Sequence, residues 1–289
     1  MILVTGANGV VGTPLCEDLL NRNIHHIKIS RFNPDSNKSI IKWDLDKPIN
    51  DQIKKQLTSV ATIIHCAPIW LLPKHLIDLN ECGITRAIVF SSTSVVSKTK
   101  SSNLQEQHLV ELLSTSENEL FSLCIKDGIA LTILRPSMIY GYTRDQNVMK
   151  IAGFIKRFGF IFLVGEAKGL RQPIHASDLV DVAINILGDK ETYGKTYNIA
   201  GGEIITYREM VERIFIGLHR KVKIISLPLF LYRFALLIAA RLTKFSFTPE
   251  MANRMNQDLN YDTSDAKNDF SFEPQKFLTS PERDLIIKK

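Results

Sequence analysis

Three glycines spaced three residues apart stand near the start of the chain, at Gly6, Gly9 and Gly12. An apolar, strand-like run over residues 2–4 precedes them, and a helix-like pattern follows. In such a turn the first glycine permits a tight bend, the second lets the backbone approach a pyrophosphate, and the third lets the helix pack closely on the strand. The free N–H groups at the start of the helix favour an anion. The alternative to an anion site is a glycine turn that serves only the packing of the helix on the strand. We expect a dinucleotide to be held by Thr5, Gly6, Asn8, Gly9, Val10, Val11 and Gly12.

The end of the second predicted strand, residues 24–30, bears on which dinucleotide is bound. NAD-binding chains usually place Asp or Glu about 20 residues beyond the glycines, where the carboxylate holds the ribose hydroxyls. This chain has Ser30 and Arg31 there instead. The guanidinium of Arg31 can pair with a 2′-phosphate through two donors, although a solvated surface arginine is the plainer interpretation. These residues favour NADP over NAD.

The glycine motif, with Thr5 and Asn8 in it, resembles that of the extended short-chain dehydrogenases/reductases, the NAD-dependent epimerase/dehydratase family. The resemblance continues at intervals to about residue 210. It implies that the segment beginning at His65 passes under the cofactor, with His65 itself a packed histidine rather than a catalytic one. The other cofactor contacts that the resemblance implies are Asp44, Cys66, Ala67, Pro68, Ser91 and Pro136.

The resemblance also implies a substrate side. Ser92 matches a Ser or Thr that hydrogen-bonds the substrate in the family, and Thr93 lies beside it. Arg171 matches an arginine that holds a nucleotide-sugar diphosphate, which suits a bidentate guanidinium. For the two hydroxyls the alternative is that they only cap the next turn, and for the arginine it is a solvated face.

The family's proton-transfer pair, Tyr-x-x-x-Lys on one helix, is missing, because residues 91–139 contain no tyrosine. Aligning the helix by Glu119 puts Glu111 at the tyrosine position and Thr115 at the lysine position. A buried glutamate can have a raised pKa and act as an acid, and Tyr140 is the nearest later phenol. The candidate catalytic residues are therefore Ser92, Glu111 and Tyr140.

The alternation of predicted strands and helices indicates an α/β fold, a Rossmann-type doubly wound parallel sheet with a smaller C-terminal substrate lobe. We expect residues 1–165 to form the dinucleotide domain, with 172–200 adding its last elements. Residues 201–289, interleaved with 142–175, would form the lobe. The apolar segment 227–242 is expected to be a buried or subunit-contact helix rather than a membrane-surface one, and a homodimer is one option.

Composition narrows the classes of function. With 289 residues and 45% hydrophobic content the chain can fill a large α/β core. The net charge of +6 is dispersed, which argues against nucleic acid. The four cysteines lack metal-site spacing, so we expect reduced thiols and no metal. Because Met1 opens directly into a strand, we expect a cytoplasmic protein.

Two functions from different classes remain. In the first, the chain acts on, or binds, a nucleotide-sugar-like anion with a degenerate catalytic site. In the second, it is a non-catalytic NADP(H)-binding redox sensor or scaffold. The cofactor would supply hydride chemistry in the first and a signal or a structural element in the second.

Overall fold

The structure is a computed structural model that describes residues 1–31, 40–99, 101, 103–231 and 253–285. The chain divides into two compact units. Residues 142–165, which the sequence analysis placed in both ranges, have most of their contacts in the second unit, and Asp262–Phe272, expected in the lobe, has most of its contacts in the first. Unit 1 comprises Met1–Pro136, Ala176–Ile199 and Asp262–Phe272, and unit 2 comprises Ser137–His175, Ala200–Tyr261 and Glu273–Lys289.

Unit 1 is built on a seven-stranded sheet in the order β11-β6-β5-β4-β1-β2-β3, in which every neighbouring pair is parallel. This confirms the predicted fold class. The order reverses between β1 and β4, so the loops that follow these two strands lie where open α/β sheets bind ligands. The strands are β1 (Ile2–Thr5), β2 (His26–Ser30), β3 (Ile40–Lys42), β4 (Thr62–His65), β5 (Arg86–Phe90), β6 (Ala130–Pro136) and β11 (Lys195–Ile199).

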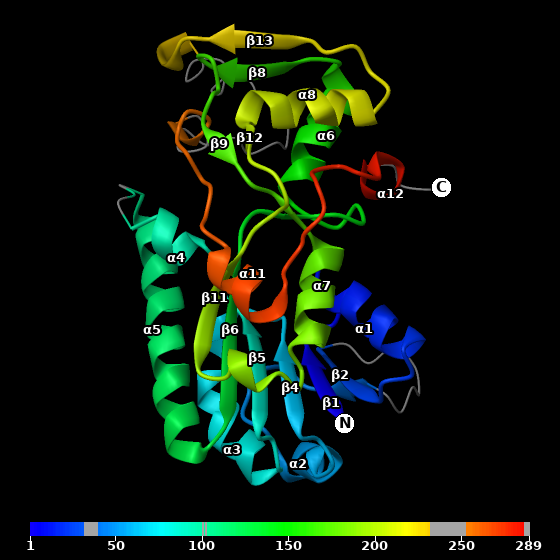
Figure 1. The fold of residues 1–289 in the computed structure, drawn as a ribbon, viewed down its shortest axis with the longest axis vertical. Coiled ribbons are helices and arrows are strands. Elements are labelled where there is room, and N and C mark those ends of the chain that lie inside the picture. The colour runs from blue at the N-terminus through cyan, green and yellow to red at the C-terminus, as the bar shows by residue number, and fades with distance from the viewer. Residues whose placement is uncertain (32–39, 100, 102, 232–252, 286–289) are drawn as a thin grey trace. The chain divides into compact units, whose positions relative to one another are not determined.

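Helices cover the sheet of unit 1 (Figure 1). Strands β1 and β5 are buried along their whole length and β4 from Ile63 onward, as expected for parallel strands with both faces covered. The core on one face joins the strands to α2, α3 and α5, while α1 packs against α7. The α-helices are α1 (Gly12–Asn21), α2 (Asp51–Leu57), α3 (Leu76–Glu81), α4 (Ser94–Ser97), α5 (Leu104–Asp127), α7 (Ala176–Asn185) and α11 (Ser264–Phe270).

Unit 2 is a smaller α/β assembly whose core packs α6 against α8. The side chain of Thr206 accepts a hydrogen bond from the backbone N–H of Glu209 and so caps the start of α8. The elements are β7 (Ile139–Tyr140), α6 (Val148–Phe158), β8 (Ile161–Val164), β9 (Leu170–Arg171), β10 (Ile174–His175), β12 (Ile205–Thr206), α8 (Tyr207–Gly217), β13 (Ile224–Leu227) and α12 (Pro281–Leu285).

The apolar segment 227–242 is described only as far as Leu231, and its remainder lies outside the described residues. In the described part, the side chains of Phe230 and Leu231 are exposed. Among the residues that the structure describes, no helix is long and apolar enough to cross a membrane.

Candidate functional site

The loop after β1 packs directly on the loop after β4. Gly6 has a φ of +66°, a conformation that side chains disfavour. A Cβ added there would lie 2.5 Å from the amide nitrogen of Ala67 and 2.5 Å from the carbonyl carbon of Cys66. Gly6 is therefore required both by its dihedral angle and by the approach of a second backbone.

The other two glycines differ in what surrounds them. A Cβ on Gly12 would lie 2.2 Å from the carbonyl oxygen of Gly6, so the start of α1 can sit on the loop only as glycine. A Cβ on Gly9 would meet, among the described residues, only that same oxygen, at 3.2 Å. Packing within the chain therefore does not explain Gly9, whose outer side is open to a ligand.

Helix α1 begins at this loop without help from a side chain. Val11 is its N-cap, and no described side chain accepts a hydrogen bond from the first turn. The loop is closed instead by backbone bonds, from the Gly9 nitrogen to the Gly6 oxygen (2.9 Å) and from the Thr13 nitrogen to the Gly9 oxygen (3.1 Å). A helix start of this kind, beside an open glycine, has the donors and the dipole that suit a diphosphate.

A buried histidine joins the ends of β1 and β4. His65 lies opposite Thr5 in the sheet, and its Nδ1 is 2.8 Å from the Thr5 hydroxyl. Its Nε2 is 3.1 Å from the carbonyl oxygen of Pro68. Burial lowers the pKa of His65 to about 4, so the ring is neutral at pH 7. With a neutral ring, Nε2 donates to Pro68 and Nδ1 accepts from Thr5, and the Cys66–Pro68 segment is fixed beside the glycine loop.

The end of β2 is tied to the same loop. The side-chain amide of Asn8 donates to the Ser30 hydroxyl at 3.2 Å. Arg31 follows immediately and is exposed. Asp44 is half-buried, and its carboxylate accepts the backbone N–H of Asp46 at 3.2 Å. The loop, Arg31 and the turn at Asp44 thus stand at the carboxyl ends of β1, β2 and β3.

The three hydroxyls after β5 all bond within unit 1. Ser91 donates to a carboxylate oxygen of Glu117 at 2.5 Å, and Thr93 donates to the carbonyl oxygen of Pro136 at 3.1 Å. The Ser92 hydroxyl accepts the backbone N–H of Ser94 at 3.1 Å. Ser92 thus caps the next turn, which is the alternative to substrate binding given above. Its hydroxyl accepts this bond and can still donate a hydrogen bond to a ligand.

An ion pair beneath these hydroxyls escaped the sequence analysis. Glu117 of α5 is 3% exposed, and its carboxylate accepts hydrogen bonds from Nε of Arg135 at 3.0 and 3.2 Å and a further one from its terminal nitrogen. Glu119, used above to align the helix, is exposed. The signal that could have found the pair is Arg135, a cation at the end of a buried strand that needs a carboxylate partner.

Counting back from Glu117 instead of Glu119 gives different residues at the positions expected for the proton-transfer pair. The residues four and eight positions earlier, on the same face of α5, are Leu113 and Leu109, and both pack against the core of unit 1. Glu111 lies elsewhere on the helix with a side chain that is 77% exposed, 4.0 Å from Nδ1 of His108. It is not the buried carboxyl that an acid role presupposes.

Two further candidates belong to unit 2, and both are engaged by its backbone. Tyr140 is 1% exposed, and its hydroxyl accepts the N–H of Leu278 at 3.0 Å and donates to the Lys276 oxygen at 3.4 Å. Arg171 is buried and donates to three carbonyl oxygens, which belong to Leu170, Arg254 and Gln257. Burial lowers the pKa of Arg171.

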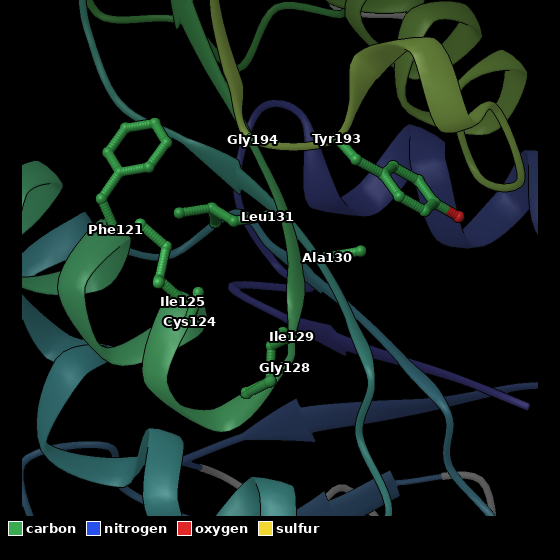
Figure 2. A pocket seen from close by; sticks show the side chains of 9 residues that line it. All are labelled: Phe121, Cys124, Ile125, Gly128, Ile129, Ala130, Leu131, Tyr193 and Gly194. Atoms are coloured by element: carbon green, nitrogen blue, oxygen red, sulfur yellow. The ribbon is translucent and has the colours of Figure 1, made fainter.

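A hollow of about 340 Å³ in unit 1 lies away from these residues. Figure 2 shows it between the end of α5, the start of β6 and Tyr193, with Ile125 and Leu131 among the lining side chains. The start of a parallel strand is at the edge opposite the glycine loop. The hollow is therefore not the dinucleotide site.

A glycine turn on a parallel sheet, at the point where the strand order reverses, is the arrangement of Rossmann-type dinucleotide-binding folds. The chain belongs to the NAD dependent epimerase/dehydratase family, whose model matches residues 2–73 and 70–200. This confirms the resemblance noted in the sequence.

Individual relatives are distant. UDP-glucose 4-epimerase of Vibrio cholerae is 21% identical over 317 residues, which span 96% of this chain and 92% of that protein. The mitochondrial NADH dehydrogenase [ubiquinone] 1 alpha subcomplex subunit 9 of Arabidopsis thaliana is 29% identical over 98 residues, 34% of this chain and 24% of that protein.

Among solved structures, the UDP-glucuronic acid 4-epimerase of Bacillus cereus, in complex with UDP-glucuronic acid and NAD, is similar with a TM-score of 0.73 and 17% identity. The match covers 98% of this chain and 97% of that one. At this identity the likeness shows a common fold.

The glycine geometry predicts how three substitutions will differ. Gly12→Ala should lower the free energy of unfolding by about 2–4 kcal/mol, because its methyl group overlaps a backbone oxygen. Gly9→Ala should stay within about 1 kcal/mol of wild type, and so should Gly188→Ala, whose added Cβ would have no described atom within 4 Å. Urea unfolding measures all three. Equal losses for Gly9→Ala and Gly12→Ala would contradict the geometry.

The neutral His65 predicts a pH dependence. Its folded pKa of about 4 lies below the unfolded value near 6.5, so its contribution to stability is present above pH 6.5 and is lost as the pH falls towards 4. The loss amounts to about 3 kcal/mol. In urea unfolding at several pH values, the stability difference between wild type and His65→Gln should shrink by that amount. A difference independent of pH would mean that the histidine is not held neutral.

Proposed function

We propose that unit 1 binds a nicotinamide dinucleotide with its diphosphate on the loop of Gly6, Gly9 and Gly12. The open side of Gly9 and the uncapped start of α1 support this, because they supply space and N–H donors at one point. Val10 and Val11 would contribute backbone contacts there. The Cys66–Pro68 segment, held by His65, would support the cofactor from the end of β4.

We favour NADP as the dinucleotide. Arg31 is exposed at the end of β2, where an NAD-selective chain would carry a carboxylate. The Asn8 bond to Ser30 keeps this strand end next to the glycine loop. Arg31 would pair with a 2′-phosphate, and Asp44 would lie on the adenine side. NAD remains the second choice, since the similar Bacillus cereus structure contains it.

We infer that the bound dinucleotide is not turned over and that the protein is a redox sensor or scaffold. The observation that carries this is the face of α5 formed by Leu109, Leu113 and Glu117. A leucine can neither hold nor move a proton, and Glu117 is neutralised by Arg135. The partial likeness to a subunit of NADH dehydrogenase is in keeping with a role inside an assembly.

A nucleotide-sugar reaction is the second candidate, favoured by the likeness to UDP-glucose 4-epimerase over nearly the whole chain. In that case Ser92, with Thr93 beside it, would orient the sugar, and Arg171 would hold a phosphate. A proton would then have to pass through Glu111 or Tyr140. Arg171 would first have to give up carbonyl partners that now occupy it.

Titration with NADPH and NADH, followed by protein fluorescence, tests the binding. The wild-type protein should bind NADPH more tightly than NADH. Gly9→Ala should raise both dissociation constants at least tenfold, since its methyl group enters the open side. Arg31→Ala should raise only the NADPH constant, by about tenfold, because a charge-assisted contact contributes on the order of 1.5 kcal/mol. Arg22→Ala, an exposed arginine of the α1 C-cap, is the matched control.

Turnover is tested with the oxidised dinucleotides NADP+ and NAD+, because only these can accept a hydride from the sugar. With UDP-glucose or UDP-glucuronic acid added, the absorbance of reduced nicotinamide should not appear, and no epimer should form. Epimer formation that Ser92→Ala abolishes would establish the enzyme and exclude the sensor. Failure of wild type to bind either dinucleotide would remove both candidates.

A further inference from the structure

One face of unit 2 has no role in the proposed dinucleotide site. Strands β8 and β13 pair in parallel and form a small sheet beside α6 and α8 (Figure 1). Ile161 and Leu163 of β8 are buried in the core of unit 2. Phe162 is half-buried and packs at the edge of the same core, and its strand partner Ile225 is 43% exposed.

Further aromatic side chains precede β8, and they line the edge of this core against the buried Phe154. The rings of Phe160 and Phe162 are 5.1 Å apart between centroids, and those of Phe158 and Phe160 are 6.4 Å apart. The guanidinium of Arg157 stands over the Phe158 ring at 5.2 Å. All three phenylalanines are half-buried. Phe158, Phe160, Phe162 and Ile225 are called the aromatic face below.

Cations surround the aromatic face. Residues 147–165 and 215–231, which form it and its approaches, contain no Asp or Glu. The nearest acid beyond β8, Glu166, is paired with Lys168. Lys221 and Lys223 alternate with Ile225 in the approach to β13, and both are exposed. These two segments carry Lys150, Lys156, Arg157, Arg220, Lys221 and Lys223.

Large apolar side chains continue past β13. Phe230 is 70% exposed and Leu231 is 43% exposed, and Val222 between the two lysines is 45% exposed. An apolar surface rimmed by one sign of charge marks an interaction site. Lysines with long apolar stems can bury those stems while their charges stay in a polar layer.

We propose that the aromatic face docks on the surface of an anionic lipid bilayer. The exposed apolar side chains would enter the boundary between headgroups and acyl chains, and the lysines would meet anionic headgroups. A second copy of the chain is disfavoured, because a twofold contact through this face would bring its cations against the same cations. Half-buried rings do not offer the stacking platform that single-stranded nucleic acid uses.

Vesicle flotation with the full chain tests the proposal, using phosphatidylcholine alone and phosphatidylcholine mixed with phosphatidylserine. Wild type should float with the mixed vesicles, should not float with phosphatidylcholine alone, and should bind less as salt is raised. Lys221→Gln with Lys223→Gln should lower the partition coefficient about 30-fold, since each cation near the surface contributes about 1 kcal/mol.

Matched controls separate this face from general charge. Lys126→Gln with Lys190→Gln removes the same charge from exposed positions of unit 1 and should change partitioning less than about twofold. Ile225→Ser with Phe230→Ser should weaken flotation even where salt leaves the lysines screened. Thermal unfolding and NADPH titration of each variant confirm that folding and dinucleotide binding are unchanged.

Three results would overturn the proposal. Wild type could fail to float with mixed vesicles, or the unit 1 controls could lose as much binding as the lysine pair. Alternatively, sedimentation velocity without lipid could show a dimer that Ile225→Ser with Phe230→Ser dissociates, and the face would then belong to a second copy. Each result leaves the dinucleotide titration intact, so the two proposals fail separately.

Discussion

The arrangement of unit 1 depends on the contact of two backbones, the loop after β1 and the loop after β4. Gly6 touches the peptide bond between Cys66 and Ala67, and Gly12 touches Gly6. No side chain larger than hydrogen fits at either contact. Helix α1 can therefore begin directly behind the loop, with its N–H donors near the sheet edge where the strand order reverses. His65 holds the two loops together through its hydrogen bonds to the Thr5 hydroxyl and to the carbonyl oxygen of Pro68.

In such a fold, dinucleotide binding and proton transfer depend on different groups. A diphosphate site made of backbone N–H groups does not depend on any titratable side chain. Proton transfer, by contrast, depends on two side chains at a helical spacing, and in α5 that face carries Leu109 and Leu113. The two properties can be lost independently, and in the function we propose this chain keeps the first, while Leu109 and Leu113 stand where the second would need side chains that carry protons.

The sequence predicted those features that follow from local chemistry. The glycine turn between a strand and a helix depends on a few neighbouring residues, and the doubly wound parallel sheet followed from the alternation of predicted strands and helices. The choice between Glu117 and Glu119 depended on which one meets Arg135, a contact between elements that spacing alone does not reveal. Likewise, the backbone partners of Tyr140, and those of Arg171 other than Leu170, come from residues more than 80 positions away.

In the function we propose, the glycine loop and the start of α1 hold the dinucleotide by their backbone N–H groups. Hydrogen exchange followed by mass spectrometry, with and without saturating NADPH, measures this directly. We expect slower exchange in peptides covering residues 6–15 and 66–72, with little change in unit 2. Protection confined to other peptides, with the glycine loop exchanging at its original rate, would contradict it.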